Sequence, residues 1–286
     1  MRLVRFGLPG EERPGVLDSE GRIRDLSSEI EDISGPLLGA GILQKLRAID
    51  PVRLPQAKPG VRLGACVSGV GKIVGVGLNY RTHALEAALE PPPEPLLFLK
   101  APSALSGPYD GIVIPKGAQS VDWEVELAVV IGRRASYVDE VEALDCIAGY
   151  AVINDVSERD FQLKRQGQWS KGKSADTFAP LGPWLLTTDE VPDPQRLDLW
   201  LDVNGVRRQS ASTGQMIFGV GALISYTSQF MTLLPGDVLA TGTPSGIGGA
   251  MTPPMYLAPG DEVTFGVAGL GEQRHRVRSY ADASAT

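Results

Sequence analysis

The sequence has few of the residues that build disulfide frameworks, zinc sites and acid–base catalysts. Its 286 residues include two cysteines, Cys66 and Cys146, which are far apart and form no C-x-x-C pair. This usage excludes a disulfide framework and a zinc knuckle, and it favours a reducing, cytoplasmic location. Only two histidines are present, His83 and His275. The search for a histidine acid or base is therefore short.

Long apolar runs and an excess of basic residues are also missing. No stretch approaches the roughly 20 apolar residues of a transmembrane helix, and Arg2, Arg5 and Pro9 interrupt the N-terminus before a signal-peptide core develops. The chain has 27 basic and 34 acidic side chains, a net charge of -7. Nucleic-acid binding relies on clustered basic residues, so we expect neither a membrane span nor a nucleic-acid partner.

The chain is otherwise typical of a folded, turn-rich protein, with 43% hydrophobic residues, 34 Gly and 22 Pro. Residues 1–65 predict a small N-terminal α/β domain that ends in a linker-like segment. Residues 70–280 hold many short apolar runs between turn residues, which predicts a mainly β domain with some α. One longer helix is expected over 215–231, where apolar residues recur at spacings of three and four.

Two glutamates two residues apart are the first candidate site. Glu124 and Glu126 stand in the apolar run VDWEVELAVVIG, and the period of a strand places both on one face. The pair either binds a hard cation or forms the solvated face of an edge strand. Asp155 ends the next run, GYAVIND, and is either a third ligand or a helix N-cap. Three carboxylates without Cys or His suit Mg²⁺ or Mn²⁺ better than zinc.

The two histidines differ in their sequence surroundings. His83 follows a strand and a Gly-containing turn, and Glu86 stands three residues later on the same predicted helix face. The two form either an acid–base pair or a structural pair. His275 lies in the basic segment EQRHRVRSY, and we expect it to be a solvated surface residue.

One sequence match to the phosphate-binding loop of nucleotide hydrolases is excluded by the residues around it. Gly167, Gly172, Lys173 and Ser174 satisfy G-x-x-x-x-G-K-S. No apolar strand precedes the match and no helix pattern follows it, although phosphate binding requires both. What remains is a loop whose Lys171 and Lys173 could bring an ammonium group over an anionic substrate.

Five motifs in this order and spacing resemble the fumarylacetoacetate hydrolase family: GLNYRTHALE, DWEVELAVVIG, NDVSERDFQ, KGKSADTFAPLGPW and LATGTPSGIG. The resemblance covers about 70–278, and the first 65 residues are similar to the smaller N-terminal domain of bacterial members. It implies a mixed β-sandwich roll, a homodimer or dimer of dimers, and Mg²⁺ or Mn²⁺ held by Glu124, Glu126 and Asp155.

The resemblance also implies roles for individual residues. His83 and Glu86 match the dyad that activates water, and Lys173 matches a catalytic lysine that stabilises an enolate. Residues that match substrate-binding positions are Arg159, Gln162 and Thr243. The implied reaction is hydrolysis of a carbon–carbon bond in a keto acid, with pyruvate as one product.

Within the family, SERDFQ, WSKGKSADTFAPLGPW and TPSGIG most resemble hydrolases of 2,4-diketo-3-deoxy-L-rhamnonate, enzymes of sugar acid catabolism that release pyruvate and lactate. Alternatives within the family are oxaloacetate decarboxylase, ureidoglycolate lyase, acylpyruvate or fumarylpyruvate hydrolase, and heptadienedioate isomerase. A non-enzymatic ligand-binding protein with the same pocket is a further alternative. The presence of both His83 and Glu86 favours a member that uses water.

Overall fold

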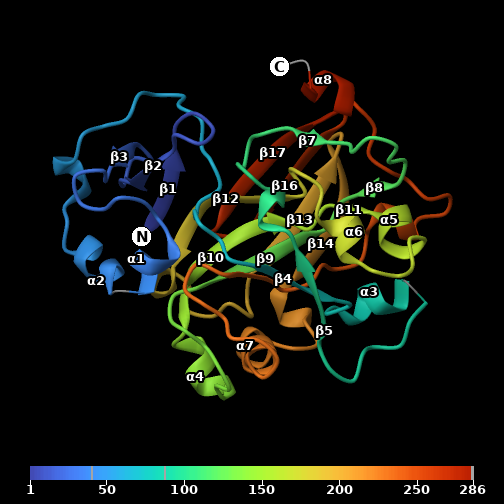
Figure 1. The fold of residues 1–286 in the computed structure, drawn as a ribbon. Coiled ribbons are helices and arrows are strands. Elements are labelled where there is room, and N and C mark those ends of the chain that lie inside the picture. The colour runs from blue at the N-terminus through green and yellow to red at the C-terminus, as the bar shows by residue number, and fades with distance from the viewer. Residues whose placement is uncertain (40, 87, 285–286) are drawn as a thin grey trace.

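The computed structural model describes residues 1–39, 41–86 and 88–284. Figure 1 shows a mainly β molecule with short helices at its periphery, which confirms the predicted fold class. In the described residues, no helix is both long and apolar enough to cross a bilayer.

The larger sheet contains ten strands of the described chain. In spatial order they are β3 (Ile23–Asp25), β2 (Arg13–Leu17), β1 (Arg2–Phe6), β12 (Ala179–Thr187), β10 (Ile147–Asn154), β9 (Val125–Ile131), β15 (Val238–Ala240), β4 (Ile73–Gly77) and β5 (Leu96–Lys100), with β6 (Leu105–Ser106) added beside β12. All residues of β9 and β10 are buried. This explains why both read as continuous apolar runs.

The second sheet contains β14 (Val206–Ser212), β13 (Asp198–Val203), β16 (Glu262–Val267), β17 (Gly271–Arg278) and β7 (Ile112–Val113). It packs on the larger sheet, since β13, β16 and β17 contact β9, β10 and β12. Their inward side chains form one core. A short ladder joins β8 (Val121–Asp122) to β11 (Ser157–Glu158).

The helices are short. They are α1 (Gly35–Gly39), α2 (Ile42–Arg47), α3 (Arg81–Glu86), α4 (Glu140–Leu144), α5 (Arg159–Leu163), α6 (Ser170–Lys173), α7 (Val220–Ser228) and α8 (Tyr280–Ser284). Single 3₁₀ turns lie at Pro51–Arg53, Pro102–Ala104, Thr188–Glu190, Thr213–Gln215 and Gly248–Ala250. Helices α5 and α6 pack together, and α6 contacts β5.

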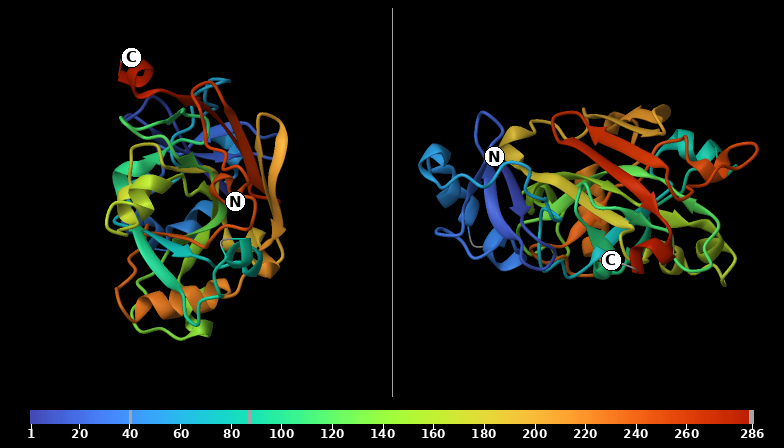
Figure 2. Two further views of the ribbon diagram at one scale, coloured as in Figure 1. Left: turned by 90° about the vertical axis from the view of Figure 1, so that its right-hand side faces the viewer. Right: turned by 90° about the horizontal axis from the view of Figure 1, so that it is seen from above.

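The N-terminal segment joins the larger sheet. β1 pairs antiparallel with β12 on one side and with β2 on the other. Seen from above in Figure 2, these strands and their helices lie at one end of the molecule. The domain boundary near residue 65 stays a prediction.

The helix expected over 215–231 is shorter than predicted. The α7 helix begins at Val220, because the residues before it pair with another segment. Ile217 N donates to Asn79 O at 2.7 Å, and Phe218 N donates to Asn79 Oδ1 at 2.9 Å. The apolar spacing predicted the buried face of α7 but not where the helix begins.

The surface position expected for His275 is wrong. His275 lies on β17 and is 0% exposed, whereas Arg274 and Arg276 on either side are exposed. The alternation of a strand turns His275 inward with Gln273. The side chains of Arg274 and Arg276 point to the opposite, exposed face of the strand.

Candidate active site

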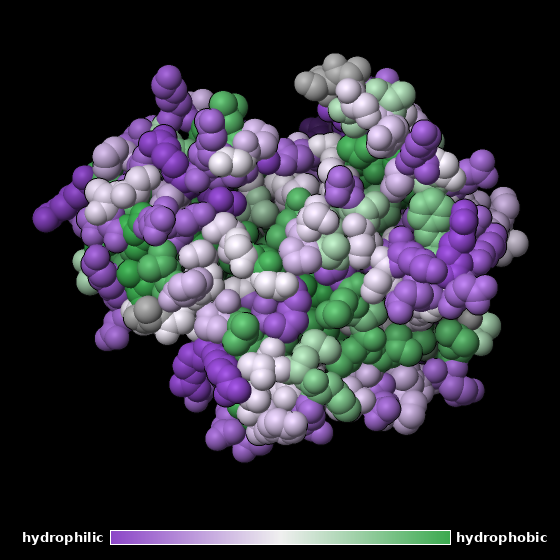
Figure 3. All heavy atoms as spheres, viewed as in Figure 1, coloured by the Kyte–Doolittle hydropathy of each residue, from purple (hydrophilic) through white to green (hydrophobic). Residues whose placement is uncertain are grey.

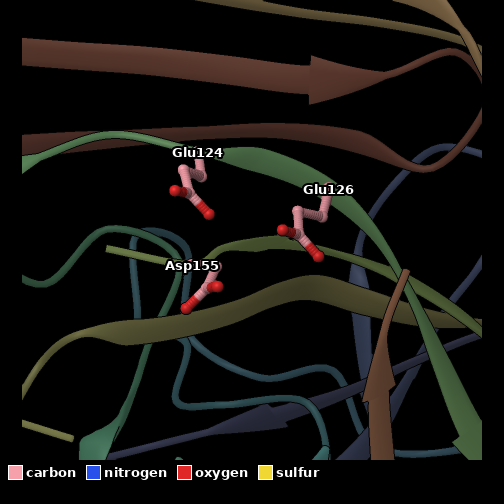
Figure 4. Close-up of side chains that lie close together, drawn as sticks. All are labelled: Glu124, Glu126 and Asp155. Carbon is pink, nitrogen blue, oxygen red and sulfur yellow. The ribbon is translucent and has the colours of Figure 1, made fainter. Parts of the chain in front are cut away.

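Three carboxylates meet where β9 begins and β10 ends. Glu124 precedes β9, Glu126 is its second residue, and Asp155 follows β10. The antiparallel register places Asn154 opposite Val125, and Asp155 N donates to Glu124 O at 2.8 Å. All three side chains are buried, and one oxygen from each lies within 4.8 Å of the other two. Figure 4 shows the three carboxylates grouped together.

Buried cations surround two of these carboxylates. Lys173 Nζ donates to Glu124 Oε2 at 2.8 Å and to Asp155 Oδ2 at 2.6 Å. Lys100 donates to the other Asp155 oxygen and, at 3.1 Å, to the carbonyl of Val156. Both lysines are almost fully buried. Burial lowers the pKa of Lys100, and the neighbouring Asp155 only partly offsets that effect.

Glu124 and Glu126 differ in charge compensation. Burial alone would raise the pKa of Glu124, but Lys173 and the nearby guanidinium of Arg159 hold it well below its ordinary value. In the described chain no Lys or Arg forms an ion pair with Glu126, whose carboxylate accepts a hydrogen bond from Gly242 N at 2.7 Å. Burial, together with the negative charges of Asp155 and Glu124, raises the pKa of Glu126 well above its ordinary value.

This arrangement fits a hard divalent cation. A buried carboxylate without a cationic partner is costly, and Glu126 is such a group. The donor set consists of carboxylate oxygens alone, which suits Mg²⁺ or Mn²⁺. The residues Glu124, Glu126 and Asp155 would hold the ion.

His83 and Glu86 form the predicted pair on α3. His83 Nδ1 lies 3.4 Å from Glu86 Oε2, and the other oxygen of Glu86 accepts a hydrogen bond from Gly246 N at 2.8 Å. Glu86 is therefore fixed on one side by backbone and faces the imidazole on the other. His83 is 7% exposed. This geometry allows the carboxylate to orient the ring while the ring remains in contact with a cavity.

The cavity that His83 borders has a volume of about 40 Å³. Its wall combines polar site residues with apolar side chains. The lining residues are Val76, Gly77, Leu78, His83, Phe98, Glu124, Arg159, Gln162, Trp169, Lys173 and Thr243. Six of the nine residues singled out from the sequence therefore line this cavity, and Glu86 and Asp155 each contact a side chain that lines it.

Arg159 and Gln162 reach the cavity from α5. Arg159 Nη1 lies 2.7 Å from Glu124 Oε1 and donates to Gln162 Oε1 at 3.0 Å. Its Nε donates to Asp122 Oδ2 at 2.9 Å. Asp122 thus holds one edge of the guanidinium while the other edge stays at the cavity. Lys171 and Lys173 lie on α6 and not in the loop predicted from the sequence. Lys171 is exposed and donates to the carbonyl of Arg165.

Thr243 lines the cavity, but its hydroxyl is already engaged. It donates to Val125 O at 2.9 Å and accepts from Gln209 Nε2 at 2.8 Å. A hydroxyl has one hydrogen and two lone pairs, so one acceptor position remains. In this arrangement Thr243 can accept from a ligand but not donate to it.

A glycine-rich loop over 242–249 links the acidic groups. Its backbone N–H groups donate to the carboxylates of Glu126, Glu86 and Asp122. The contacts are Gly242 N to Glu126, Gly246 N to Glu86, and Gly248 N and Gly249 N to Asp122, at 2.7 to 2.9 Å. One loop therefore positions a candidate metal ligand, the partner of His83 and the partner of Arg159.

Sequence reasoning missed four residues of the site. Lys100 ends an apolar strand, and Asp122 precedes Glu124 by two residues, so the period of two that identified Glu124 and Glu126 also applied to Asp122. Phe98 stands in the apolar run LLFLK and Trp169 two residues before Lys171, and neither sequence context indicates a site residue. Nothing local to LLFLK indicates that its lysine is buried beside Asp155.

Comparison with known proteins gives a family assignment for this site. Residues 72–278 match the family model described as fumarylacetoacetate (FAA) hydrolase, C-terminal. A Burkholderia orbicola protein that carries only the general name of hydrolase is 55% identical over 280 residues, which are 98% of this chain and 99% of that protein.

Solved structures share the whole fold. The fumarylacetoacetate hydrolase of Exiguobacterium antarcticum superposes with a TM-score of 0.86 at 35% identity, over 98% of this chain and 99% of that chain. The maleylpyruvate hydrolase of Sphingobium sp. SYK-6, solved with manganese(II) and pyruvate, gives a TM-score of 0.79 at 31% identity over 98% and 99% of the two chains.

Proposed function

Because the chain belongs to the fumarylacetoacetate hydrolase family, we propose that it is a divalent-metal-dependent hydrolase that cleaves a carbon–carbon bond of a 2,4-diketo acid. The observation that carries this proposal is the meeting of three buried carboxylates, of which Glu126 lacks a cationic partner, and a histidine–glutamate pair beside one small cavity. The manganese and pyruvate bound by the Sphingobium relative agree with it.

The proposed cofactor is Mg²⁺ or Mn²⁺, held by Glu124, Glu126 and Asp155. When bound, such an ion polarises the oxygens of a keto acid and stabilises enolate charge. The protein contributes an anionic, buried donor set and the two lysines that position Asp155.

His83 acts as the general base of the proposed reaction. It takes a proton from water, and the resulting hydroxide adds to the C4 carbonyl of the diketo acid. The C3–C4 bond then breaks, and its electron pair passes to C3 to give the enolate of pyruvate. Protonated His83 returns the proton to C3. One water is consumed, and the products are pyruvate and a carboxylic acid.

Positive and polar groups hold the substrate's oxygens. Lys173 is placed to stabilise the developing enolate, while Arg159 and Gln162 bind carboxylate or keto oxygens. The remaining acceptor position of Thr243 suits a substrate hydroxyl or a water molecule and not a carboxylate or keto oxygen. Lys173 is well suited to this role because, although burial lowers its pKa, Asp155 and Glu124 raise it above the ordinary value and so keep the ammonium charged.

We propose 2,4-diketo-3-deoxy-L-rhamnonate as a candidate substrate, cleaved to pyruvate and lactate, from the motifs that resemble that branch. The second candidate function is a lyase, decarboxylase or isomerase of the same family, because these reactions also stabilise an enolate in such a site. The pairing of His83 with Glu86 favours the hydrolase. A cytoplasmic homodimer or dimer of dimers stays a prediction.

Metal removal tests the proposal. We expect EDTA to abolish pyruvate release from acetylpyruvate, and Mg²⁺ or Mn²⁺ to restore it. Glu126→Gln should weaken Mn²⁺ binding, measured by calorimetry, at least tenfold. Glu272→Gln, which changes an exposed glutamate, is the matched control and should bind Mn²⁺ normally. Activity that is indifferent to chelation would reject a metal-dependent hydrolase, and CO₂ as the product from oxaloacetate in place of acetylpyruvate cleavage would favour the second candidate.

A further inference from the structure

The inner cavity is too small for a complete substrate with a long tail. Its volume is about 40 Å³. A buried water needs about 10–15 Å³ on the same measure, so the cavity has room for about three waters. That space suits a keto acid head group beside the cation cluster. A longer acyl tail must therefore leave the cavity.

Two aromatic side chains separate this cavity from a larger groove. Phe98 and Trp169 line the inner cavity and also line a groove of about 440 Å³ on the outside. The groove residues are Leu96, Leu97, Phe98, Leu99, Gly167, Gln168, Trp169 and Ser170. None of these eight carries an ionisable side chain. Leu96 and Leu99 are 37% and 43% exposed.

Glycines of β4 create room for this aromatic wall. A Cβ at Gly75 would lie 2.3 Å from the ring of Phe98, and one at Gly77 would lie 2.7 Å from the ring of Trp169. The two rings are 5.6 Å apart at 54°. Lys173 Nζ lies 4.9 Å from the centre of the Phe98 ring. The wall thus contacts the catalytic lysine on its inner side and the leucine groove on its outer side.

We propose that the acyl tail of the substrate leaves the inner cavity along the side of the contacting Phe98–Trp169 pair and lies in this outer groove, so that the enzyme prefers 2,4-diketo acids with uncharged, apolar tails. This inference rests on the proposed function. Three observations support it: the small inner cavity, the wall shared by both spaces, and a groove lined by leucines without a charge. A tail that ends in a carboxylate would lie among leucines, and none of the eight residues that line the groove carries a positive charge.

The chain-length dependence gives the first test. Each buried methylene is worth about fourfold in binding, and the groove is open on one side. We therefore expect kcat/KM for hexanoylpyruvate to exceed that for acetylpyruvate at least tenfold. Succinylpyruvate, whose tail ends in a carboxylate, should be at least tenfold poorer than hexanoylpyruvate.

A charge placed in the groove gives the second test. Leu99→Lys should lower the ratio of hexanoylpyruvate to succinylpyruvate kcat/KM at least tenfold, because the ammonium repels the apolar tail and attracts the charged one. Val206→Lys is the matched control: it changes a half-exposed apolar residue on β14, an edge strand of the other sheet. The control should leave the ratio unchanged.

Direct binding separates this inference from the proposed function. We expect 2-oxooctanoate to bind at least tenfold more tightly than pyruvate in the presence of Mn²⁺, measured by calorimetry, and Leu99→Lys to remove the difference. If no acylpyruvate is cleaved but this difference holds, the proposed hydrolase activity fails and the groove assignment stands.

Equal kcat/KM values for the three acylpyruvates would overturn the groove assignment. Figure 3 shows hydrophobic residues gathered on the face where β5 and α3 lie in Figure 1, so a second copy of the chain is the competing occupant. Loss of a dimer in Leu99→Lys, measured by light scattering, together with no dependence on tail length, would assign the groove to that second copy.

Discussion

The two histidines of the chain lie in opposite environments. His83 sits on the short helix α3, borders the inner cavity and faces a carboxylate. His275 lies in the second sheet, where its Nδ1 is 2.6 Å from the carbonyl oxygen of Asp110 and its ring stacks on Phe265. The same side chain is available for proton transfer in one place and forms part of the core in the other. Surroundings, not residue type, decide its role.

Two opposing effects act on the charge of His275. Nδ1–H donates to Asp110 O, so a neutral ring leaves Nε2 without a proton 3.1 Å from Gln273 Oε1. Protonation would add a charged hydrogen bond, worth about 1.5–3 kcal/mol. Full burial opposes the charge by up to about 3–5 pKa units, or about 4–7 kcal/mol. Burial is the larger effect and lowers the pKa of His275 to about 4.

Removing the imidazole of His83 should have the largest effect. We expect His83→Ala to lower kcat/KM for acetylpyruvate by about 10²–10⁴-fold, the usual contribution of a general base. The free energy of unfolding and Mn²⁺ affinity should change little, because His83 borders a cavity. Urea denaturation and calorimetry check both. A variant that keeps its rate would remove His83 from the mechanism.

Removing the imidazole of His275 should lower stability and leave activity nearly unchanged. His275→Ala leaves a cavity against Phe265 and an unpaired Asp110 carbonyl, and we expect it to lower the free energy of unfolding by about 3 kcal/mol. Its kcat/KM should stay within about threefold of wild type below the unfolding transition, because His275 does not line the inner cavity and its loss acts on stability. Arg276→Ala, at the exposed neighbour, is the control and should change stability by less than about 0.5 kcal/mol.

Acid should destabilise the protein through His275. Its pKa is about 4 in the folded state and about 6.5 when unfolded, so between these values the unfolded chain binds more protons. The stability that this group contributes is complete above pH 6.5 and is lost as the pH falls to about 4, a total of about 3 kcal/mol. Urea denaturation at pH 7 and pH 4.5 measures the loss. His275→Gln should show a smaller loss, and an equal loss would contradict the assignment.

Removing the charge of Glu86 should have the smallest effect. Glu86→Gln keeps an oxygen for Gly246 N but removes the negative charge that faces His83. We expect kcat/KM to fall about tenfold, equivalent to about 1.4 kcal/mol. Glu90→Gln changes an exposed glutamate and should have no effect. An unchanged rate in Glu86→Gln would show that the pair is structural.

Local patterns predicted the parts of the molecule that depend on neighbours in sequence. The spacing of Glu124 and Glu126 on one strand, and of His83 and Glu86 on one helix, gave groups that the structure also brings together. Strand alternation is consistent with an inward His275, whereas the charged residues on either side of it indicate a surface segment. The many short apolar runs between turn residues also predicted the mainly β fold class.

Long-range contacts explain what the sequence could not predict. Lys100 reaches Asp155 only because β5 and α6 pack beside the end of β10. The first residue of α7 depends on Asn79, which lies far away in the sequence and pairs with the backbone before the helix. The hydrogen bond from Gln209 to Thr243 also depends on a long-range contact, because Gln209 lies on β14 of the second sheet.

The loop over 242–249 holds three acidic groups through peptide N–H donors, not through its own side chains. Evolution can therefore exchange the side chains of Ser245 and Ile247 without releasing any of those carboxylates. A single inserted or deleted residue would instead shift the donors out of register for all three at once. Positions 245 and 247 should consequently vary among relatives while the length of the loop and its glycines stay constant, because a Cβ at Gly246 or Gly248 would lie 1.9 or 2.0 Å from a backbone oxygen.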